Sequence, residues 1–139
     1  MERHDVDVVV VGGGTGGCFA AAKAAREGLD VTLLERKTRD DGGRIACGDA
    51  LKGRGSLPDV IDLDRLADES FTNRNVQRGV FESENEKVEI SLDEAGKVVD
   101  RKRYGEVLLD VTRLASSHQL RVASNAYQEY RSIRIYRGL

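Results

Sequence analysis

The stretch Val8-Val9-Val10-Val11-Gly12-Gly13-Gly14-Thr15-Gly16-Gly17 decides the fold of this chain. Residues 5–11 first alternate between polar and apolar side chains and then become continuously apolar, which is typical of a buried parallel strand. Residues 18–27 are rich in Ala and favour a helix, and Gly28 is well suited to end it. Residues 30–35 form a second apolar segment. The order of strand, glycine turn, helix and strand predicts a β-α-β unit.

The glycines of this turn match the G-x-G-x-x-G spacing of dinucleotide-binding folds. We expect Gly12 to allow the tight turn out of the strand and Gly14 to let the backbone approach a pyrophosphate. Gly17 is expected to let the helix pack closely on the strand. Around Thr15 and Gly16 the helix N-terminus then offers free N–H groups and a positive dipole end to phosphate. The alternative is a glycine-rich turn that binds nothing.

An acidic residue, Glu35, ends the second strand, 23 residues after Gly12. A carboxylate at this place accepts hydrogen bonds from the ribose hydroxyls of an adenosine. It disfavours NADP, because it repels the 2′-phosphate, although the basic residues Arg36 and Lys37 follow it directly. An acid on the surface with no ligand is the alternative. The sequence therefore predicts an α/β, Rossmann-like fold that binds FAD or NAD(P).

The middle of the chain predicts a β-hairpin region inserted after this β-α-β unit. We expect a loop (36–55), a short helix (59–67), two strands (76–81 and 87–92) joined by a turn, a second turn (93–96) and a short strand (97–99). Asp100 is a suitable N-cap for a helix that continues through Leu109.

The composition excludes several other classes of protein. The 139 residues suit one domain, and 33% charged residues with few aromatics indicate neither a disordered tail nor a membrane protein. The net charge of −2 attracts no nucleic acid, so no such partner is expected. The charged N-terminus does not resemble a signal peptide. Cys18 and Cys47 lie far apart, which predicts no metal site and a cytoplasmic location.

Two later stretches resemble motifs of one enzyme family. Gly43-Arg44-Ile45-Ala46-Cys47-Gly48-Asp49-Ala50 resembles the Cys-Gly-Glu-Gly segment of the geranylgeranyl reductase family. Asp100-Arg101-Lys102-Arg103-Tyr104 resembles the Asp-Arg-Lys-x-Phe signature of the same family. With the glycine turn, the three motifs occur in the family's order. The resemblance implies an aromatic-hydroxylase-like flavoprotein fold, FAD as cofactor, and saturation of isoprenoid double bonds, including those of archaeal membrane lipids.

The resemblance also implies which residues hold the cofactor. Cys47, Gly48 and Ala50 would line the flavin site, and Arg101 would reach FAD from the start of its helix. Arg44 would act similarly, because a guanidinium offers phosphate two fixed donors. The full set of expected cofactor-binding residues is Gly12, Gly14, Thr15, Gly16, Gly17, Glu35, Arg36, Arg44, Cys47, Gly48, Ala50 and Arg101. No catalytic residue is assigned.

Three positions depart from the family pattern. Thr15 stands where the family usually has Pro, Asp49 stands for Glu, and Ala50 stands for Gly. The Ala50 methyl group would tighten the approach to the isoalloxazine. These differences affect the fine geometry of the expected site and not the class of the protein.

The composition changes abruptly near Thr112. Residues 1–112 hold 17 Lys+Arg and 23 Asp+Glu, whereas residues 113–139 hold five Arg and one Glu. In the family that this chain resembles, a Gly and then a strand follow the helix that carries Arg101. We expect both to be missing here, and we expect the strand that completes the sheet to lie beyond this chain. The chain is therefore divided into the N-terminal part of an incomplete FAD-binding domain (1–112) and an atypical basic tail (113–139). The tail is interpreted as an out-of-frame read, with a genuine basic strand as the alternative.

Three functions are compatible with these observations. The first is an FAD-dependent oxidoreductase of geranylgeranyl reductase type, present as a truncated fragment. Its substrate would be an isoprenoid lipid or another small molecule, and the full-length enzyme would contact a membrane peripherally. The second is another FAD-dependent enzyme, a monooxygenase or a dehydrogenase. The third is a nucleotide-binding module without catalysis of its own. The Gly-Asp and aromatic-Pro motifs that the family carries further along are missing from this sequence, and the oligomeric state is not assigned.

Overall fold

The computed structural model describes residues 5–38, 41, 49–52, 57–66, 69–115 and 120–124. Its centre is the β-α-β unit that the sequence predicts, formed by β1 (Val8–Val11), α1 (Thr15–Arg26) and β2 (Val31–Glu35). The two strands are parallel, with Val8 opposite Val31. The α/β fold and the Rossmann-like β-α-β arrangement are thereby confirmed.

A third strand, β6 (Leu120–Ser124), pairs in parallel with the other side of β2. The sheet order β1-β2-β6 reproduces the first three strands of a dinucleotide-binding sheet, where the third strand also lies next to the second. The expectation that no strand follows the helix that carries Arg101 is therefore wrong. Leu120 and Val122 both contact the core, and the exposed Arg121 lies between them, which is the alternation of a half-buried strand.

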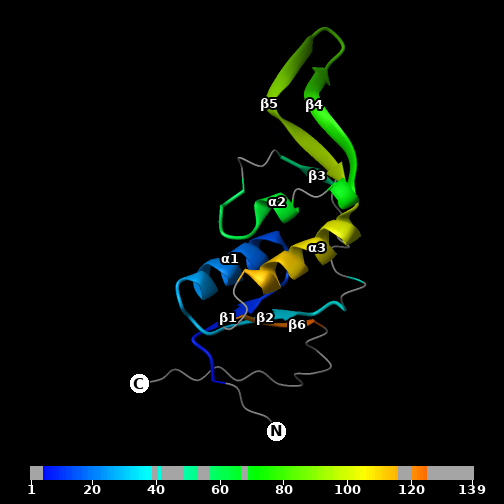
Figure 1. Cartoon of the computed structure of the whole chain (residues 1–139). Coiled ribbons are helices and arrows are strands. Elements are labelled where there is room, and N and C mark those ends of the chain that lie inside the picture. The colour runs from blue at the N-terminus through cyan, green and yellow to red at the C-terminus, as the bar shows by residue number, and fades with distance from the viewer. Residues whose placement is uncertain are drawn as a thin grey trace.

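The core lies between this sheet and the two long helices. Helices α1 and α3 (Arg101–Leu114) lie side by side over one face of the sheet (Figure 1). Their inward faces bury Cys18, Phe19, Ala21, Ala22, Ala25, Tyr104, Leu108, Leu109 and Val111. Because most of the α1 residues in this set are small, the helix sits close to the strands beneath it.

Two glycines of the turn permit this close approach. Gly12 has φ +106°, a conformation that side chains disfavour. A Cβ at Gly17 would lie only 1.8 Å from the carbonyl oxygen of Gly12. Helix α1 therefore contacts the end of β1 through bare backbone. At its other end Gly28, with φ +91°, terminates the helix as expected.

A long antiparallel ribbon, β4 (Thr72–Glu82) and β5 (Lys87–Val99), projects away from the helices (Figure 1). The inserted hairpin is confirmed, and a short strand, β3 (Ala50–Leu51), pairs with the base of β5. The expected turn at residues 93–96 is wrong, because β5 continues through it. The pairing is irregular there, because Val76 pairs with Gly96 and Arg78 with Ser91, so residues 92–95 of β5 lie opposite Gln77 alone.

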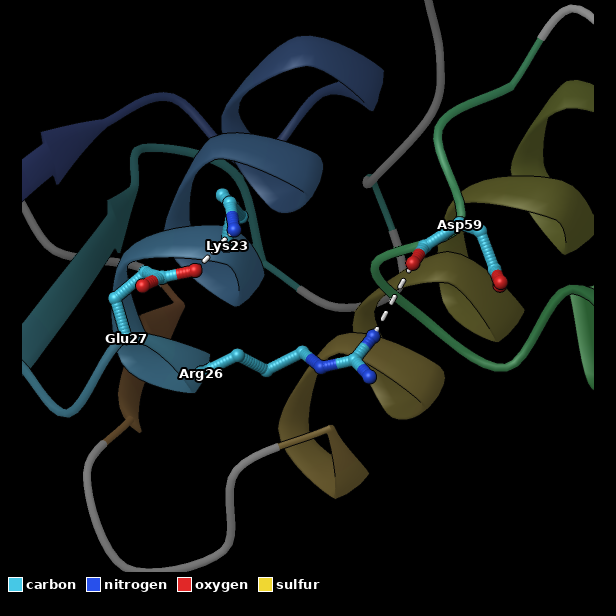
Figure 2. Close-up of polar contacts among 4 residues, drawn as sticks. All are labelled: Lys23, Arg26, Glu27 and Asp59. Atoms are coloured by element: carbon cyan, nitrogen blue, oxygen red, sulfur yellow. Dashed lines mark hydrogen bonds and ion pairs between the residues drawn. The ribbon is translucent and has the colours of Figure 1, made fainter.

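Short elements connect the ribbon to the helical layer. Helix α2 (Leu63–Leu66) lies within the predicted short helix, and a 3-10 turn, η3 (Glu69–Phe71), precedes β4. Figure 2 shows Arg26, at the end of α1, donating from Nη1 to the main-chain carbonyl of Asp59 over 3.2 Å. Lys23 and Glu27 form an ion pair one turn apart on the exposed side of α1. Because these contacts are exposed, they contribute little to stability.

The start of α3 agrees with the sequence. The Asp100 side chain accepts a hydrogen bond from the main-chain N–H of Arg103 over 3.0 Å. The main-chain N–H of Asp100 donates to the carbonyl of Phe71 over 2.7 Å. Asp100 is thus the N-cap, and it also holds the helix against η3. Over the residues that the structure describes, no helix has the length and apolarity needed to cross a membrane.

We predict that Gly17→Ala destabilises the protein by about 1–3 kcal/mol or more, because the new methyl group overlaps the Gly12 backbone. Gly16→Ala is the matched control, since a Cβ there meets nothing within 4 Å and Ala favours a helix. Urea unfolding of both variants measures the difference. Equal stabilities would contradict the close contact.

We also predict that Asp100→Ala lowers the free energy of unfolding by about 1 kcal/mol, because the Arg103 N–H loses its acceptor. Asp100→Asn should retain most of the stability, since an amide oxygen also caps a helix. Thermal unfolding followed by circular dichroism checks both. A destabilisation by Asn as large as that by Ala would argue against the capping role.

Candidate functional site

The first turn of α1 forms an open group of backbone donors. The first intrahelical bond runs from the Cys18 N–H to the Gly14 carbonyl over 2.9 Å. The N–H groups of residues 15–17 precede that bond, so the helix itself offers them no acceptor. No acidic side chain lies in this first turn of α1, all of which is described. A Cβ at Gly14 or Gly16 would meet nothing within 4 Å, which leaves room for a phosphate group.

The Glu35 carboxylate lies directly beside this turn. Its Oε2 accepts a hydrogen bond from the Gly13 N–H over 2.6 Å, and its Oε1 accepts one from the Lys37 N–H over 2.8 Å. The parallel register of β1 and β2 sets this position, because it pairs Val11 with Leu34. An ionised carboxylate has about four acceptor positions. Two therefore remain for the hydroxyl groups of a ribose.

The start of α3 reaches the same turn. The Tyr104 hydroxyl lies 3.4 Å from Thr15 Oγ1, and the Arg101 guanidinium lies 5.3 Å from the centroid of the Tyr104 ring. The Tyr104 ring also contacts Phe71 edge-on, with centroids 5.4 Å apart. Burial raises the pKa of Tyr104, against smaller lowering effects from Thr15 and Arg101. The phenol is therefore protonated and able to donate near neutral pH.

The sequence-predicted residues fall into three groups. The turn residues and Glu35 come together. Arg101 lies against the ring of Tyr104, whose hydroxyl contacts Thr15 of the turn. Arg36 is exposed just after β2, and Ala50 is exposed on β3, opposite Val98. Arg44, Cys47 and Gly48 lie outside the described residues.

Asp49 is connected through its backbone to the strand end that leads into α3. Asp49 has φ +55°, which is unusual for a residue other than glycine, and its carbonyl accepts from the Val99 N–H over 2.8 Å. Val99 directly precedes the N-cap Asp100. Asp49, near the end of the stretch that resembles the flavin segment, thus contacts the residue before the stretch that carries Arg101.

Two residues of the site were absent from the sequence prediction. Gly13 donates to Glu35, and a Cβ at this glycine would lie 3.1 Å from Glu35 Cβ and 3.2 Å from Leu109 Cδ2. The Tyr104 hydroxyl, at the start of α3, contacts Thr15 at the start of α1. A signal for the Gly13 contact was present in the sequence, because Gly13 is an additional glycine between two that the motif requires. The tyrosine occurs in the last position of the Arg101 stretch, but only the packing of α1 on α3 shows its partner.

Cys18 is a residue of the core. Its thiol is buried and lies 3.4 Å from the Gly13 carbonyl. Burial raises the pKa of Cys18 from 9.0 to about 11; Thr112 opposes this shift and the charge of Glu35 adds to it. The thiol is therefore neutral near pH 7.

The family model described as Glucose inhibited division protein A matches residues 7–133. The chain belongs to this family. It is 32% identical to the digeranylgeranylglycerophospholipid reductase of Methanocaldococcus jannaschii, over 77% of this chain and 26% of the reductase. It is also 43% identical to the tRNA uridine 5-carboxymethylaminomethyl modification enzyme MnmG of Treponema pallidum, over 47% of this chain and 10% of that enzyme.

Solved structures of the same fold agree with this assignment. A geranylgeranyl bacteriochlorophyll reductase-like protein from Thermoplasma acidophilum superposes with a TM-score of 0.70 and 28% identity, over 86% of this chain and 30% of the other. The myxobacterial FAD-dependent halogenase CndH gives a TM-score of 0.64 at 22% identity, over 86% of this chain and 28% of the halogenase, which shows a shared fold alone. The resemblance to geranylgeranyl reductases is confirmed. The chain spans less than a third of the length of these reductases.

We predict that native Cys18 reacts with iodoacetamide roughly 100-fold more slowly than the unfolded chain at the same mildly alkaline pH, because its raised pKa leaves less thiolate. A Cys47→Ala background makes Cys18 the single thiol. Mass spectrometry after timed quenching measures the rate.

The same pKa shift predicts a pH dependence of stability. The contribution of the neutral Cys18 thiol is fully present below pH 9 and is lost as the pH rises towards about 11, because the unfolded chain ionises first. Cys18→Ala should remove that part of the alkaline destabilisation. Equal alkaline losses in the two proteins, or rapid alkylation of the native thiol, would contradict the raised pKa.

Proposed function

We propose that this chain forms the FAD-binding part of an oxidoreductase of geranylgeranyl reductase type, which saturates isoprenoid double bonds of lipids. The observation that carries the proposal is the Glu35 carboxylate, which lies 2.6 Å from the Gly13 N–H, beside the open first turn of α1. An acceptor for ribose next to donors for pyrophosphate matches the ADP half of a dinucleotide.

Each group in this arrangement has a separate task. The N–H groups of the first turn of α1 bind the pyrophosphate, and Gly14 lets it approach the backbone. Glu35 binds and orients the ribose through its two remaining acceptor positions. Arg101, from the start of α3, neutralises phosphate charge close to Thr15. FAD, when bound, supplies the hydride chemistry of the reaction.

Electrostatics favours FAD over NADP as the ligand. A phosphate on the adenosine 2′-oxygen would meet the negative Glu35 carboxylate, whose place is set by two main-chain donors. The named FAD-dependent halogenase of the same fold supports FAD as the dinucleotide. We extend the flavin contacts to Arg36, Arg44, Cys47, Gly48 and Ala50 on the family resemblance.

The lipid substrate is inferred from the named relatives. Reductases of digeranylgeranylglycerophospholipids match 77% to 91% of this chain. The tRNA-modifying relative and the halogenases share part of the same segment but carry names of different reactions. The shared segment therefore serves the nucleotide, and further residues select the substrate. An isoprenoid lipid implies peripheral membrane contact in the complete enzyme, and we retain the cytoplasmic location in this proposal.

A second candidate is a nucleotide-binding module without catalysis. It is favoured by one observation, which is that relatives named for different reactions match this same chain. In that case the dinucleotide would bind without a reaction. The substrate test below separates the two candidates.

The cofactor is tested by titrating the purified protein with FAD and following the quenching of flavin fluorescence. We predict that Glu35→Gln weakens FAD binding about 10-fold, because a hydrogen bond to a charged acceptor contributes about 1.5–3 kcal/mol. The same change should weaken the discrimination against NADP. Glu27→Gln is the control, because Glu27 is an exposed acid of α1 paired with Lys23. Unchanged FAD affinity in the Glu35 variant would contradict the proposed site.

The substrate class is tested with the FAD-loaded protein, a chemical reductant and a geranylgeranyl lipid in detergent. Mass spectrometry detects a gain of two hydrogens for each double bond that is reduced. Such a product supports the lipid reductase. Bound flavin without product favours the nucleotide-binding module.

A further inference from the structure

Two positions that differ from the family motifs lie in contact with each other. Thr15 stands where the geranylgeranyl reductase pattern has Pro, and Tyr104 stands where the Asp-Arg-Lys-x-Phe signature has Phe. They are 89 residues apart in the sequence, yet Thr15 Oγ1 lies 3.4 Å from the Tyr104 hydroxyl. Neither Pro nor Phe has a hydroxyl group. The contact therefore exists only because both positions differ together.

We infer that Tyr104 is a positioning residue that acts through Thr15, holding the Thr15 hydroxyl so that its own proton is directed to the pyrophosphate of the bound dinucleotide. The inference rests on the proposed dinucleotide site. It adds a side-chain donor to the backbone donors of the α1 turn. The residue that orients this donor is Tyr104 on α3, which lies outside the glycine motif.

The environments of the two hydroxyl groups give the direction of the hydrogen bond. Tyr104 is only 2% exposed, packed between Phe71 and Arg101, whereas Thr15 is half-buried at the start of α1. A buried phenol that is protonated donates to the acceptor within its reach, and Thr15 Oγ1 lies there. A hydroxyl that accepts one hydrogen bond still has its own proton to donate. That proton belongs to the residue at the first helical position, next to the open N–H groups.

The pair also compensates for the missing proline. Pro at the first position of a helix presets φ and has no N–H group. Thr15 adds one N–H donor to the turn but leaves its backbone less restricted in the unfolded chain. The contact with Tyr104 supplies a tertiary restraint at the same residue. Because Tyr104 also stacks with the Arg101 guanidinium, one ring orients two groups that face phosphate.

The inference is tested by measuring FAD affinity in Thr15→Val, Tyr104→Phe and the double variant. We expect Thr15→Val to weaken binding about 10-fold, because a hydrogen bond to a charged phosphate is lost. Tyr104→Phe should weaken it about 3-fold, because Thr15 keeps its hydroxyl but loses the group that orients it. In the Thr15→Val background, Tyr104→Phe should have no further effect, since the Tyr104 hydroxyl acts only through Thr15 and phenylalanine keeps the ring beside Arg101.

Controls separate positioning from a loss of folding. Thr15→Ser should retain nearly the full affinity, because serine keeps the hydroxyl group. Ser91→Ala removes an exposed hydroxyl on β5 and should change nothing. Thermal unfolding of every variant without FAD checks that the fold persists, and the affinity of variants with unchanged transitions is compared.

The outcomes are distinct from those that test the proposed function. Wild-type protein that does not bind FAD overturns the proposed site and, with it, this inference. Wild-type protein that binds FAD, with effects of the two substitutions that simply add, overturns the inference alone. Tyr104→Phe with wild-type affinity does the same. Non-additive losses with rescue by Thr15→Ser support it.

Discussion

The contact between the backbones of Gly12 and Gly17 is the constraint on which the rest of the structure depends. The absence of a side chain at Gly17 lets α1 start immediately beside the end of β1, where a Cβ would overlap the Gly12 carbonyl. The first turn of the helix thereby comes to lie at the edge of the sheet. The parallel register of β1 and β2 then places Glu35 beside the same turn. Donors and acceptor are assembled by close packing.

Helix α3 completes this arrangement from the other side. Its start is determined by the Asp100 cap, and the preceding Val99 N–H binds the Asp49 carbonyl. These contacts hold the start of the Arg101 stretch against Asp49. Tyr104 then extends the network to Thr15. The starts of α1 and α3, which are 89 residues apart at Thr15 and Tyr104, are therefore in contact.

The comparisons with known proteins separate the nucleotide-binding segment from the choice of substrate. Relatives named for lipid reduction and for tRNA modification share residues of this chain, although their names describe unrelated substrates. One nucleotide-binding segment can serve different reactions, because a cofactor carries the redox chemistry and other residues select the substrate. The fold accordingly supports the cofactor assignment more directly than the substrate assignment.

The sequence by itself determined the β-α-β unit, the N-cap Asp100 and the pairing of a glycine turn with Glu35, because these depend on local patterns and short spacings. Only the tertiary structure decided where β6 pairs, that β5 runs through residues 93–96, and that Tyr104 meets Thr15. Each of these depends on contacts between residues far apart in the chain. Local propensity predicts a turn at residues 93–96, for example, whereas β5 carries the extra residues as an irregularity between the paired Ser91 and Gly96. The side chain that supports the first turn of α1 comes from another helix, and no spacing within the turn indicates it.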